Sequence, residues 1–267
     1  MNSTGIQPFR SIKVTKPYSI PLRSLYSKNI KNLWMAGRNI SASHVALSST
    51  RVMATCALMG QAIGTAASYA ITNHLAPTQV GNQAKHTQSL QQLLLRQDQG
   101  ILGVVNEDQK DLARKAKVTA STETADGPAT AIIDGINRVV QDGKTHQWQA
   151  KIEENTPWIA LKWDTAVKLN TIQLTFDTGL NRYLRISPQD WVYNKQIRGA
   201  QPETIADYTI ELLKNGTVVH SIPVKNNYLR LVKHDFKEQN IDTVRIKVQK
   251  TNGDPLARIF EVRCYLD

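Results

Sequence analysis

The chain has 267 residues, of which 41% are hydrophobic and 21% are charged, so it holds enough apolar material for one large domain or two ordinary ones. This composition excludes a collagen-like chain, a low-complexity chain and a disulfide-stapled miniprotein. The two cysteines, Cys56 and Cys264, have no cysteine or histidine beside them, so they predict neither a disulfide framework nor a zinc site.

The net charge of +11 lies almost entirely in the first third of the chain. Residues 1–97 contain ten lysines and arginines and no aspartate or glutamate, whereas the remaining residues are nearly balanced. The chain therefore joins two segments of different character.

No targeting or membrane-spanning segment is predicted. Residues 1–10 lack the apolar stretch of a signal peptide. Residues 52–72 are rich in alanine and glycine and include Gln61 and Ser68, which indicates a tightly packed internal helix and not a membrane span.

The first segment is predicted to contain a strand and then a helix. Residues 32–36 form an unbroken apolar run, typical of a strand buried on both faces. After a polar loop, a small-residue helix is predicted over residues 48–72, with Ser48, Ser49 and Thr50 as candidate N-caps. Residues 76–90 are predicted to be a linker, and residues 90–97 a short helix.

From residue 111 the pattern changes to short strands separated by turns, which is typical of an all-β sandwich. Asn215-Gly216 is a strong signal for a two-residue hairpin between two of these strands. The insertion over residues 178–203 has no strand periodicity and predicts a long loop. The predicted strands cover residues 158–163, 168–176, 208–213, 217–224, 227–236, 244–248 and 259–265.

The spacing of two tryptophans in the first of these strands predicts which one faces the core of the sandwich. Trp158 and Trp163 are five positions apart, so they point to opposite faces of a regular strand. We predict that Trp158 is the more deeply buried of the two, because Ala160 is too small to cover the other face.

Several linked motifs in the first segment resemble one known family. They are Pro17-Tyr-Ser-Ile-Pro-Leu-Arg23, Asn32-Leu-Trp-Met-Ala-Gly-Arg38, Ile40-Ser-Ala-Ser-His-Val-Ala46, Ser49-Thr-Arg-Val-Met-Ala-Thr55 and Met59-Gly-Gln-Ala-Ile-Gly-Thr-Ala-Ala67. Residues 10–75 resemble the C-terminal end of FAD-dependent oxidoreductases, in which this piece supplies the last parallel strand, a loop and a helix that covers the flavin.

The resemblance implies a set of cofactor contacts. The backbone at Arg51, Val52 and Met53 would face the pyrimidine edge of the flavin, because a helix N-terminus suits an electron-rich oxygen. Gly37 would allow close approach to the cofactor, and Arg38 would meet its ribityl or pyrophosphate part. Gln61 is a further candidate contact on the same helix.

Two candidate catalytic residues keep alternative interpretations. His44 could pass a proton to or from the substrate, or it could be a loop histidine that bonds the backbone. Arg23 could bind a substrate carboxylate or simply face solvent.

The chain departs from the family at the dinucleotide site. It has no GxGxxG motif and no N-terminal βαβ unit, so we expect a fragment whose partner is a missing N-terminal Rossmann domain. We therefore expect the isolated chain to purify colourless, to bind FAD weakly or not at all, and to be inactive. The acid-free segment could face a nucleic acid, an acidic partner domain or the pyrophosphate of FAD. Sparse aromatic residues and the lack of a recognition motif argue against nucleic acid.

The second segment resembles the discoidin, or galactose-binding-like, β-sandwich. The matching motifs are Asp111-Leu-Ala-Arg-Lys-Ala-Lys-Val-Thr-Ala-Ser121, Pro128-Ala-Thr-Ala-Ile-Ile-Asp-Gly135, His146-Gln-Trp148, Pro157-Trp-Ile-Ala-Leu161 and Ala257-Arg-Ile-Phe-Glu-Val-Arg263. Relatives often bind glycans and hold a structural calcium, here at the positions of Asp134 and Glu261. The insertion between Asp134 and Trp148 argues against the metal, so no metal site is predicted. Trp191 and Tyr193 could form a sugar-stacking platform or the small core of a long loop, and we favour the small core.

The predicted fold is therefore mostly β, a discoidin-like sandwich with an N-terminal strand-loop-helix remnant of an FAD-binding α/β domain. The predicted boundaries are residues 1–75, a linker over 76–110, and the sandwich over 111–267. The predicted function is the C-terminal portion of an FAD-dependent oxidoreductase, and the alternative is a carbohydrate-binding module with an inactive remnant. We also expect self-association through residues 1–75, which light scattering would detect.

Overall fold

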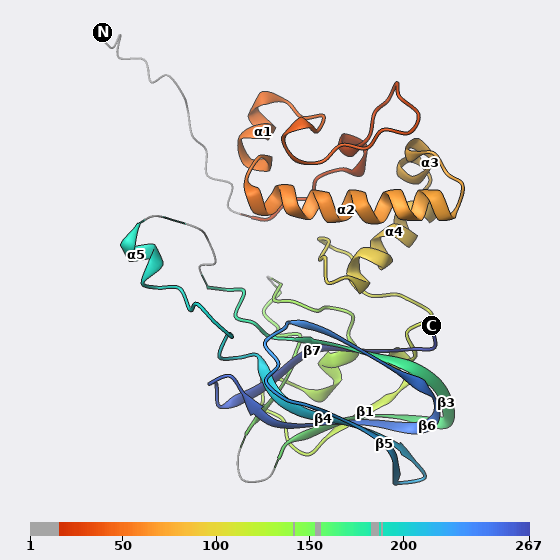
Figure 1. Ribbon diagram of the computed structural model, residues 1–267, viewed down its shortest axis with the longest axis vertical. Coiled ribbons are helices and arrows are strands. Elements are labelled where there is room, and N and C mark those ends of the chain that lie inside the picture. The colour runs from red at the N-terminus through yellow and green to blue at the C-terminus, as the bar shows by residue number, and fades with distance from the viewer. Residues whose placement is uncertain (1–15, 141, 153–155, 183–186, 188) are drawn as a thin grey trace. The chain divides into compact units, whose positions relative to one another are not determined.

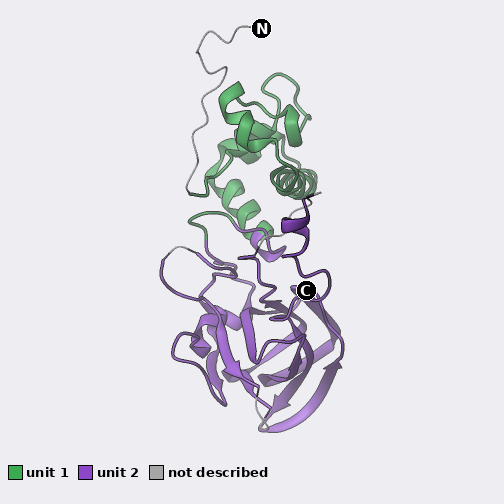
Figure 2. Cartoon of the chain, turned by 90° about the vertical axis from the view of Figure 1, so that its left-hand side faces the viewer, with its two compact units in different colours: residues 1–94, 101–104 green, residues 95–100, 105–267 purple. Residues whose placement is uncertain are grey.

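The structure, a computed structural model, describes residues 16–140, 142–152, 156–182, 187 and 189–267 (Figure 1). The chain divides into two compact units, coloured separately in Figure 2. Unit 1 comprises residues 1–94 and 101–104, and unit 2 comprises residues 95–100 and 105–267. Among the described residues, no helix is both long and apolar enough to cross a bilayer.

The regular elements of the described part of unit 1 are all helices, joined by irregular segments. They are two short 3₁₀ helices, η1 (Leu22–Leu25) and η2 (Gly37–Asn39), and four α-helices, α1 (His44–Thr50), α2 (Met53–Thr72), α3 (Pro77–Asn82) and α4 (Ala84–Arg96).

The predicted helix over residues 48–72 is in fact two helices. Ser43 caps α1, accepting a hydrogen bond from the Ala46 amide at 3.3 Å. Ser48 and Thr50 lie inside α1, where their hydroxyls donate to carbonyls one turn back, so they do not cap α2. The extended backbone of Val52 separates the two helices, so that α2 begins at Met53.

The predicted strand over residues 32–36 does not form. Its one ladder contact is an isolated bridge between Trp34 and Tyr26, whose rings meet edge to face at 5.8 Å. Asn32 and Leu33 are exposed. A strand that is apolar on both faces needs strands on either side, and the described part of unit 1 supplies none.

The predicted linker over residues 76–90 is also wrong, because α3 and most of α4 occupy it. Pro77 stands at the first turn of α3, where its missing N–H costs nothing. In α4 the leucines gather on one face, and Leu90 and Leu94 pack against Ala66 and Ala70 of α2. The glutamines that read as linker lie within this amphipathic helix, since glutamine is a good helix former.

Unit 2 is an antiparallel β structure, which confirms the mostly β prediction. Its strands are β1 (Lys117–Ala120), β2 (Trp148–Lys151), β3 (Trp158–Phe176), β4 (Ile205–Lys214), β5 (Thr217–Val224), β6 (Leu231–Thr251) and β7 (Leu256–Tyr265). Two 3₁₀ helices, η3 (Leu112–Lys115) and η4 (Ala129–Ile133), and the short helix α5 (Asp190–Tyr193) complete it.

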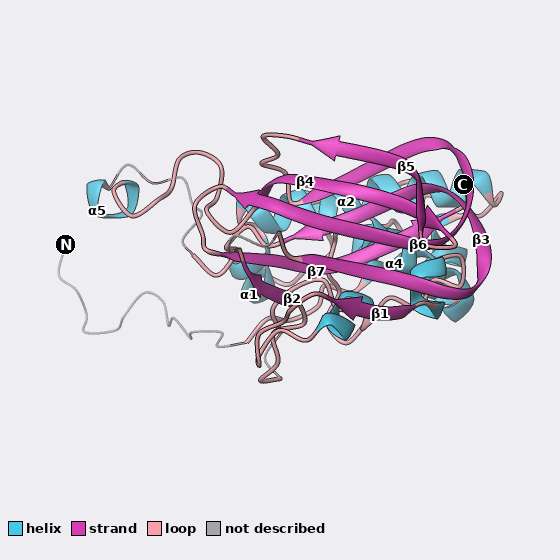
Figure 3. Ribbon diagram, turned by 90° about the horizontal axis from the view of Figure 1, so that it is seen from below, coloured by secondary structure: helices cyan, strands magenta, loops and turns pink. Residues whose placement is uncertain are grey.

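The strands follow the order β2-β7-β3-β6-β4-β5, with β1 also beside β3 (Figure 3). The first part of β3 pairs with β1 and its last part pairs with β7, on either side of a register shift between Lys162 and Val167. The long strands β3 and β6 therefore run through both layers of the sandwich. Each joins two strands that the sequence pattern predicts separately.

The Asn215-Gly216 prediction is confirmed. These two residues join β4 to β5, and both have positive φ, 51° at Asn215 and 79° at Gly216. Because a type I′ hairpin turn needs positive φ at both central positions, asparagine followed by glycine is the favoured pair.

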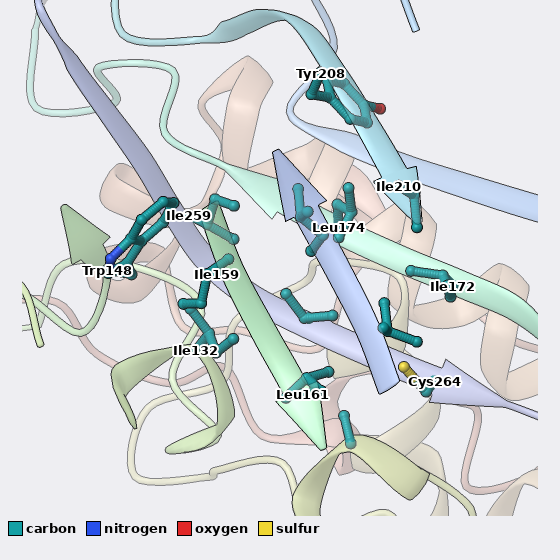
Figure 4. Packing of buried hydrophobic residues seen from close by; sticks show 14 of the residues in the cluster. Ile132, Trp148, Ile159, Leu161, Ile172, Leu174, Tyr208, Ile210, Ile259 and Cys264 are labelled. Carbon is teal, nitrogen blue, oxygen red and sulfur yellow. The ribbon is translucent and has the colours of Figure 1, made fainter. Parts of the chain in front are cut away.

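The core of unit 2 lies between the two layers and is close-packed (Figure 4). The prediction for the tryptophans is wrong: Trp163 is 5% exposed, whereas Trp158 is only half-buried. Ile159, Leu161 and Trp163 alternate along β3 and share the core-facing side. Ala160 faces the other way and is still 6% exposed, paired with Thr119 of β1 and Arg245 of β6.

Candidate functional site

The residues expected to face a flavin meet at the junction of α1 and α2. Arg51 ends α1, Val52 is extended, and Met53 starts α2. The 3₁₀ helix η2, which carries Gly37 and Arg38, contacts both helices. The structure therefore brings five of the six expected cofactor contacts to one place.

The start of α2 offers free backbone donors. The N-cap, Val52, provides no side-chain hydrogen bond, and the first amides of any helix lack intrahelical partners. Val52 is 52% exposed and Met53 is 73% exposed, so these amides stand open beside an apolar shoulder. The positive end of the helix dipole adds to them, which suits an electron-rich oxygen.

The backbone at Gly37 has the conformation that close approach requires. Its φ is +84°, which glycine adopts without strain, and a Cβ built there would lie 3.9 Å from the nearest side-chain atom, Oδ1 of Asn39. Arg38, the next residue, is exposed and makes no ion pair among the described residues.

The other expected site residues lie apart from this junction. Gln61 lies about two turns along α2 from Met53 and is half-buried. His44 is the first residue of α1 and is exposed, with no hydrogen bond to its side chain among the described residues. Arg23 lies on η1, which contacts α3.

Helix α2 is apolar on two faces. One face, with Ala62, Ala66 and Ala70, is buried in unit 1. The other face is exposed, and a Cβ built at Gly60 or Gly64 would meet no atom within 4 Å. This open face consists of Met53, Ala57, Gly60, Gly64, Ser68 and Ile71, of which only Ser68 is polar.

A second candidate site lies on the loops of unit 2. Asn227, only 8% exposed, fixes the β5–β6 loop by donating from its side chain to the carbonyls of Ile205 and Leu229 at 2.8 and 3.1 Å. The side chain of Asn252 donates to the Asn227 carbonyl at 3.0 Å. This hydrogen-bonded loop leaves Tyr228 67% exposed and Leu229 50% exposed. No sequence motif singles out Tyr228, although the preceding Asn226-Asn227 pair is a turn signal.

Trp191 and Tyr193 belong to α5 and are exposed by 53% and 47%. The favoured small-core interpretation is therefore wrong, because Val192, at 1% exposure, is the residue that anchors this helix. Arg198 lies 3.3 Å from the ring centroid of Tyr193, so one face of that ring is already covered by a cation.

The two positions that the discoidin resemblance implies for calcium are already bonded within unit 2. One oxygen of Asp134 accepts from the Ile136 amide at 2.8 Å, and the other contacts Nδ1 of His146 at 2.7 Å. Nε2 of the same imidazole lies 2.7 Å from Asp142. Burial alone would lower the pKa of His146, but the two carboxylates raise it above its ordinary value.

Glu261 is buried beside Arg263, with Nε and Oε2 2.8 Å apart. Its second oxygen lies 3.4 Å from the side-chain nitrogen Nδ2 of Asn106. The same nitrogen donates to Asp111 at 3.0 Å. Burial raises the pKa of both Asp111 and Glu261, and the charge of Arg263 opposes the rise. In the described part of the chain, no three His, Cys, Asp or Glu side chains are grouped to hold a metal ion.

Comparison with known families supplies an assignment. Residues 111–256, more than half of the chain, match the profile described as "Domain of unknown function (DUF7402)". The chain belongs to this family. In this DUF7402 member, residues 2–94 also match the profile described as "FAD dependent oxidoreductase", which confirms the resemblance of the first segment. A search of curated proteins found no match.

Solved structures similar to this DUF7402 chain include three sugar-binding modules. A chitosan-binding module of a chitosanase/glucanase from Paenibacillus sp. IK-5 is 16% identical with a TM-score of 0.42, over 58% of this chain and 98% of that one. The family 32 module of C. perfringens NanJ, solved with galactose, is 20% identical with a TM-score of 0.41, over 58% and 96%. A fucose-binding module from Streptococcus pneumoniae is 12% identical with a TM-score of 0.45, over 59% and 98%.

Proposed function

We propose that residues 16–94 form the flavin-covering part of an FAD-dependent oxidoreductase, with the N-terminus of α2 directed at the pyrimidine edge of the flavin. The observation that carries this proposal is the match of residues 2–94 to that family. The open amides at Met53 and the positive φ of Gly37, on the adjoining η2, support it.

The residues at this junction fit the group that the family implies. FAD, when bound, supplies hydride transfer at its flavin ring. The start of α2 would stabilise the negative charge that collects on the pyrimidine oxygens, through free N–H groups and the helix dipole. Arg38 would bind the phosphate-bearing part as a charge-assisted donor. His44 and Arg23 are the proposed proton carrier and substrate-carboxylate ligand.

The ADP half of FAD needs a second polypeptide region, because the sequence contains no GxGxxG motif. We propose that this dinucleotide-binding region covers the open face of α2. The described part of unit 1 bears lysines and arginines and no carboxylate side chain, so two copies of unit 1 would repel each other. Self-association through this unit is therefore the weaker alternative.

A charge placed at the start of α2 tests the proposal. Of the two expectations stated above, weak binding of FAD or none, we propose weak binding, with a dissociation constant in the millimolar range. We expect Val52→Asp to weaken binding about tenfold, because the new carboxylate repels the flavin oxygens and phosphates. Aspartate is a good N-cap, so the variant should keep the helix intact. Equilibrium dialysis against FAD measures the effect.

The matched control is Ile71→Asp, which places the same charge on the exposed far end of α2 and should leave the affinity unchanged. Equal losses in the two variants would show that FAD responds only to net charge. If neither variant lost affinity for FAD, the start of α2 would not belong to the binding site.

A second candidate function is carbohydrate binding by unit 2, which one observation favours. Tyr228 stands exposed on a loop that Asn227 holds rigidly, and an immobilised aromatic face binds a sugar ring at little entropic cost. Trp191 and Tyr193 on α5 are the competing platform.

Alanine substitutions separate the two platforms. In a glycan-array screen of the full chain, we expect Tyr228→Ala to reduce binding of any recognised glycan about tenfold, because the stacking face is lost. Trp191→Ala should retain binding. The reverse ranking would assign the sugar site to α5, and a wild-type chain that binds no glycan would contradict this candidate function.

A further inference from the structure

The outer side of β7 carries a buried pair of opposite charges. Glu261 is 2% exposed and Arg263 is 1% exposed, and the two side chains meet at 2.8 Å. Since an unpaired ion at this depth would be very costly, each charge depends on the other. The pair stands at one of the two positions where the discoidin resemblance implies a calcium ion.

At those two positions, Glu261 and Asp134, each carboxylate oxygen already has a hydrogen-bond partner in the protein. Arg263 and Asn106 bond the two oxygens of Glu261. The amide of Ile136 and the ring of His146 bond the two oxygens of Asp134. Calcium takes six to eight oxygen ligands, whereas here the carboxylate oxygens of Glu261 and Asp134 face nitrogen atoms of the protein. The residues present therefore do not fit the ion.

Arg263 also makes a contact that a metal ion could not make. A terminal nitrogen of its guanidinium donates to the Leu95 carbonyl at 3.2 Å, at the point where the chain enters unit 2. Eleven residues farther on, Asn106 donates its backbone amide to the Gly135 carbonyl at 2.9 Å, and its side chain donates to Asp111. Hydrogen bonds thus hold Leu95, Asn106 and Asp111 within unit 2, and Asp111 also accepts from the Cys264 amide of β7 at 3.0 Å.

We infer that Arg263 is a built-in cation that takes the place of a structural calcium ion in unit 2, neutralising Glu261 and holding the chain at Leu95 against β7. The fold of unit 2 is therefore independent of calcium. A guanidinium can neutralise Glu261 and also bond the Leu95 carbonyl, because it carries a permanent charge and several donors in a fixed plane.

Calcium titration of the wild-type chain tests this inference without any substitution. An ion that binds only the folded state raises the melting temperature. The melting temperature of unit 2 should therefore differ by less than about 1 °C between millimolar calcium chloride and EDTA. Calorimetry should also detect no calcium binding. A rise of several degrees in calcium would overturn the inference.

Substitutions in the full chain test the charge role of Arg263. Arg263→Met should lower the melting temperature by about 10 °C, because it leaves Glu261 buried without a counter-charge. The double variant Glu261→Gln/Arg263→Met should regain most of that loss. A single variant as stable as the wild type, or a double variant no more stable than the single, would show that Arg263 does not act as the cation for Glu261.

Discussion

Replacing Trp163 with alanine is expected to lower the free energy of unfolding of unit 2 by about 3–5 kcal/mol, the range for deleting a large aromatic side chain from a core. The ring is 5% exposed in the core cluster, and its Nε1 donates to the Leu112 carbonyl at 2.9 Å, so a cavity and an unpaired acceptor would remain. Urea denaturation followed by circular dichroism measures the loss.

Trp158→Ala provides the matched comparison on the same strand. Trp158 is half-buried and lies on the outward side of β3, so its removal should cost about 1–2 kcal/mol. If the two variants lost equal stability, or Trp158→Ala lost more, the side of β3 assigned to the core would be wrong.

Replacing Asp98 with alanine is expected to cost unit 2 about 2–3 kcal/mol. Its carboxylate pairs with Arg230 at 2.7 Å and accepts from the side chain of Asn137 at 3.0 Å, and the Asp98 and Arg230 side chains are 17% and 13% exposed. Removing the carboxylate leaves the Arg230 charge largely buried, and partial solvent access reduces the cost below that of a fully buried pair.

Asp98→Asn separates charge from shape in this interaction. Asp98 has φ of 63°, which asparagine tolerates better than alanine, so the asparagine variant keeps the backbone conformation and loses only the charge. It should lose less stability than the alanine variant. Hydrogen exchange should show residues 95–100 opening in the alanine variant, and unchanged protection there would contradict a role for Asp98 in attaching this segment.

Turn and alternation patterns correctly predicted the elements whose conformation depends only on residues close by in the sequence. The Asn215-Gly216 turn requires two positive φ values, and alternating apolar residues mark β4 and β6 without reference to the rest of the chain. The same patterns divided β3 and β6 into shorter strands. Exposed polar residues at the bends, such as Asp164 in β3, resemble turn residues until the pairing partners are known.

The failures in unit 1 come from missing neighbours and from an ambiguous pattern. Residues 32–36 have strand-like side chains but no strands beside them in the described part of unit 1, so propensity alone does not form a strand. The sequence makes Ser48 a candidate helix cap, yet a serine can equally bond a carbonyl inside a helix, as Ser48 does.

The candidate sites were predictable to different degrees. Family motifs located the residues from Gly37 to Met53, because the chain order of those motifs carries the information. Tyr228, Asp98 and Arg263 were missed, because their roles depend on contacts with distant segments. The spacing of Glu261 and Arg263, two apart on one strand, does place them on the same face and could have suggested the pair.

Backbone amide mapping by NMR, with FAD titrated into the full chain, tests the central proposal most directly. If residues 16–94 form a flavin-covering segment, amide signals should shift at residues 36–38 and 51–54, at the η2 loop and the start of α2. Val52→Asp should remove the shifts at the start of α2. Shifts confined to unit 2, or no shift at the highest soluble FAD concentration, would contradict the account.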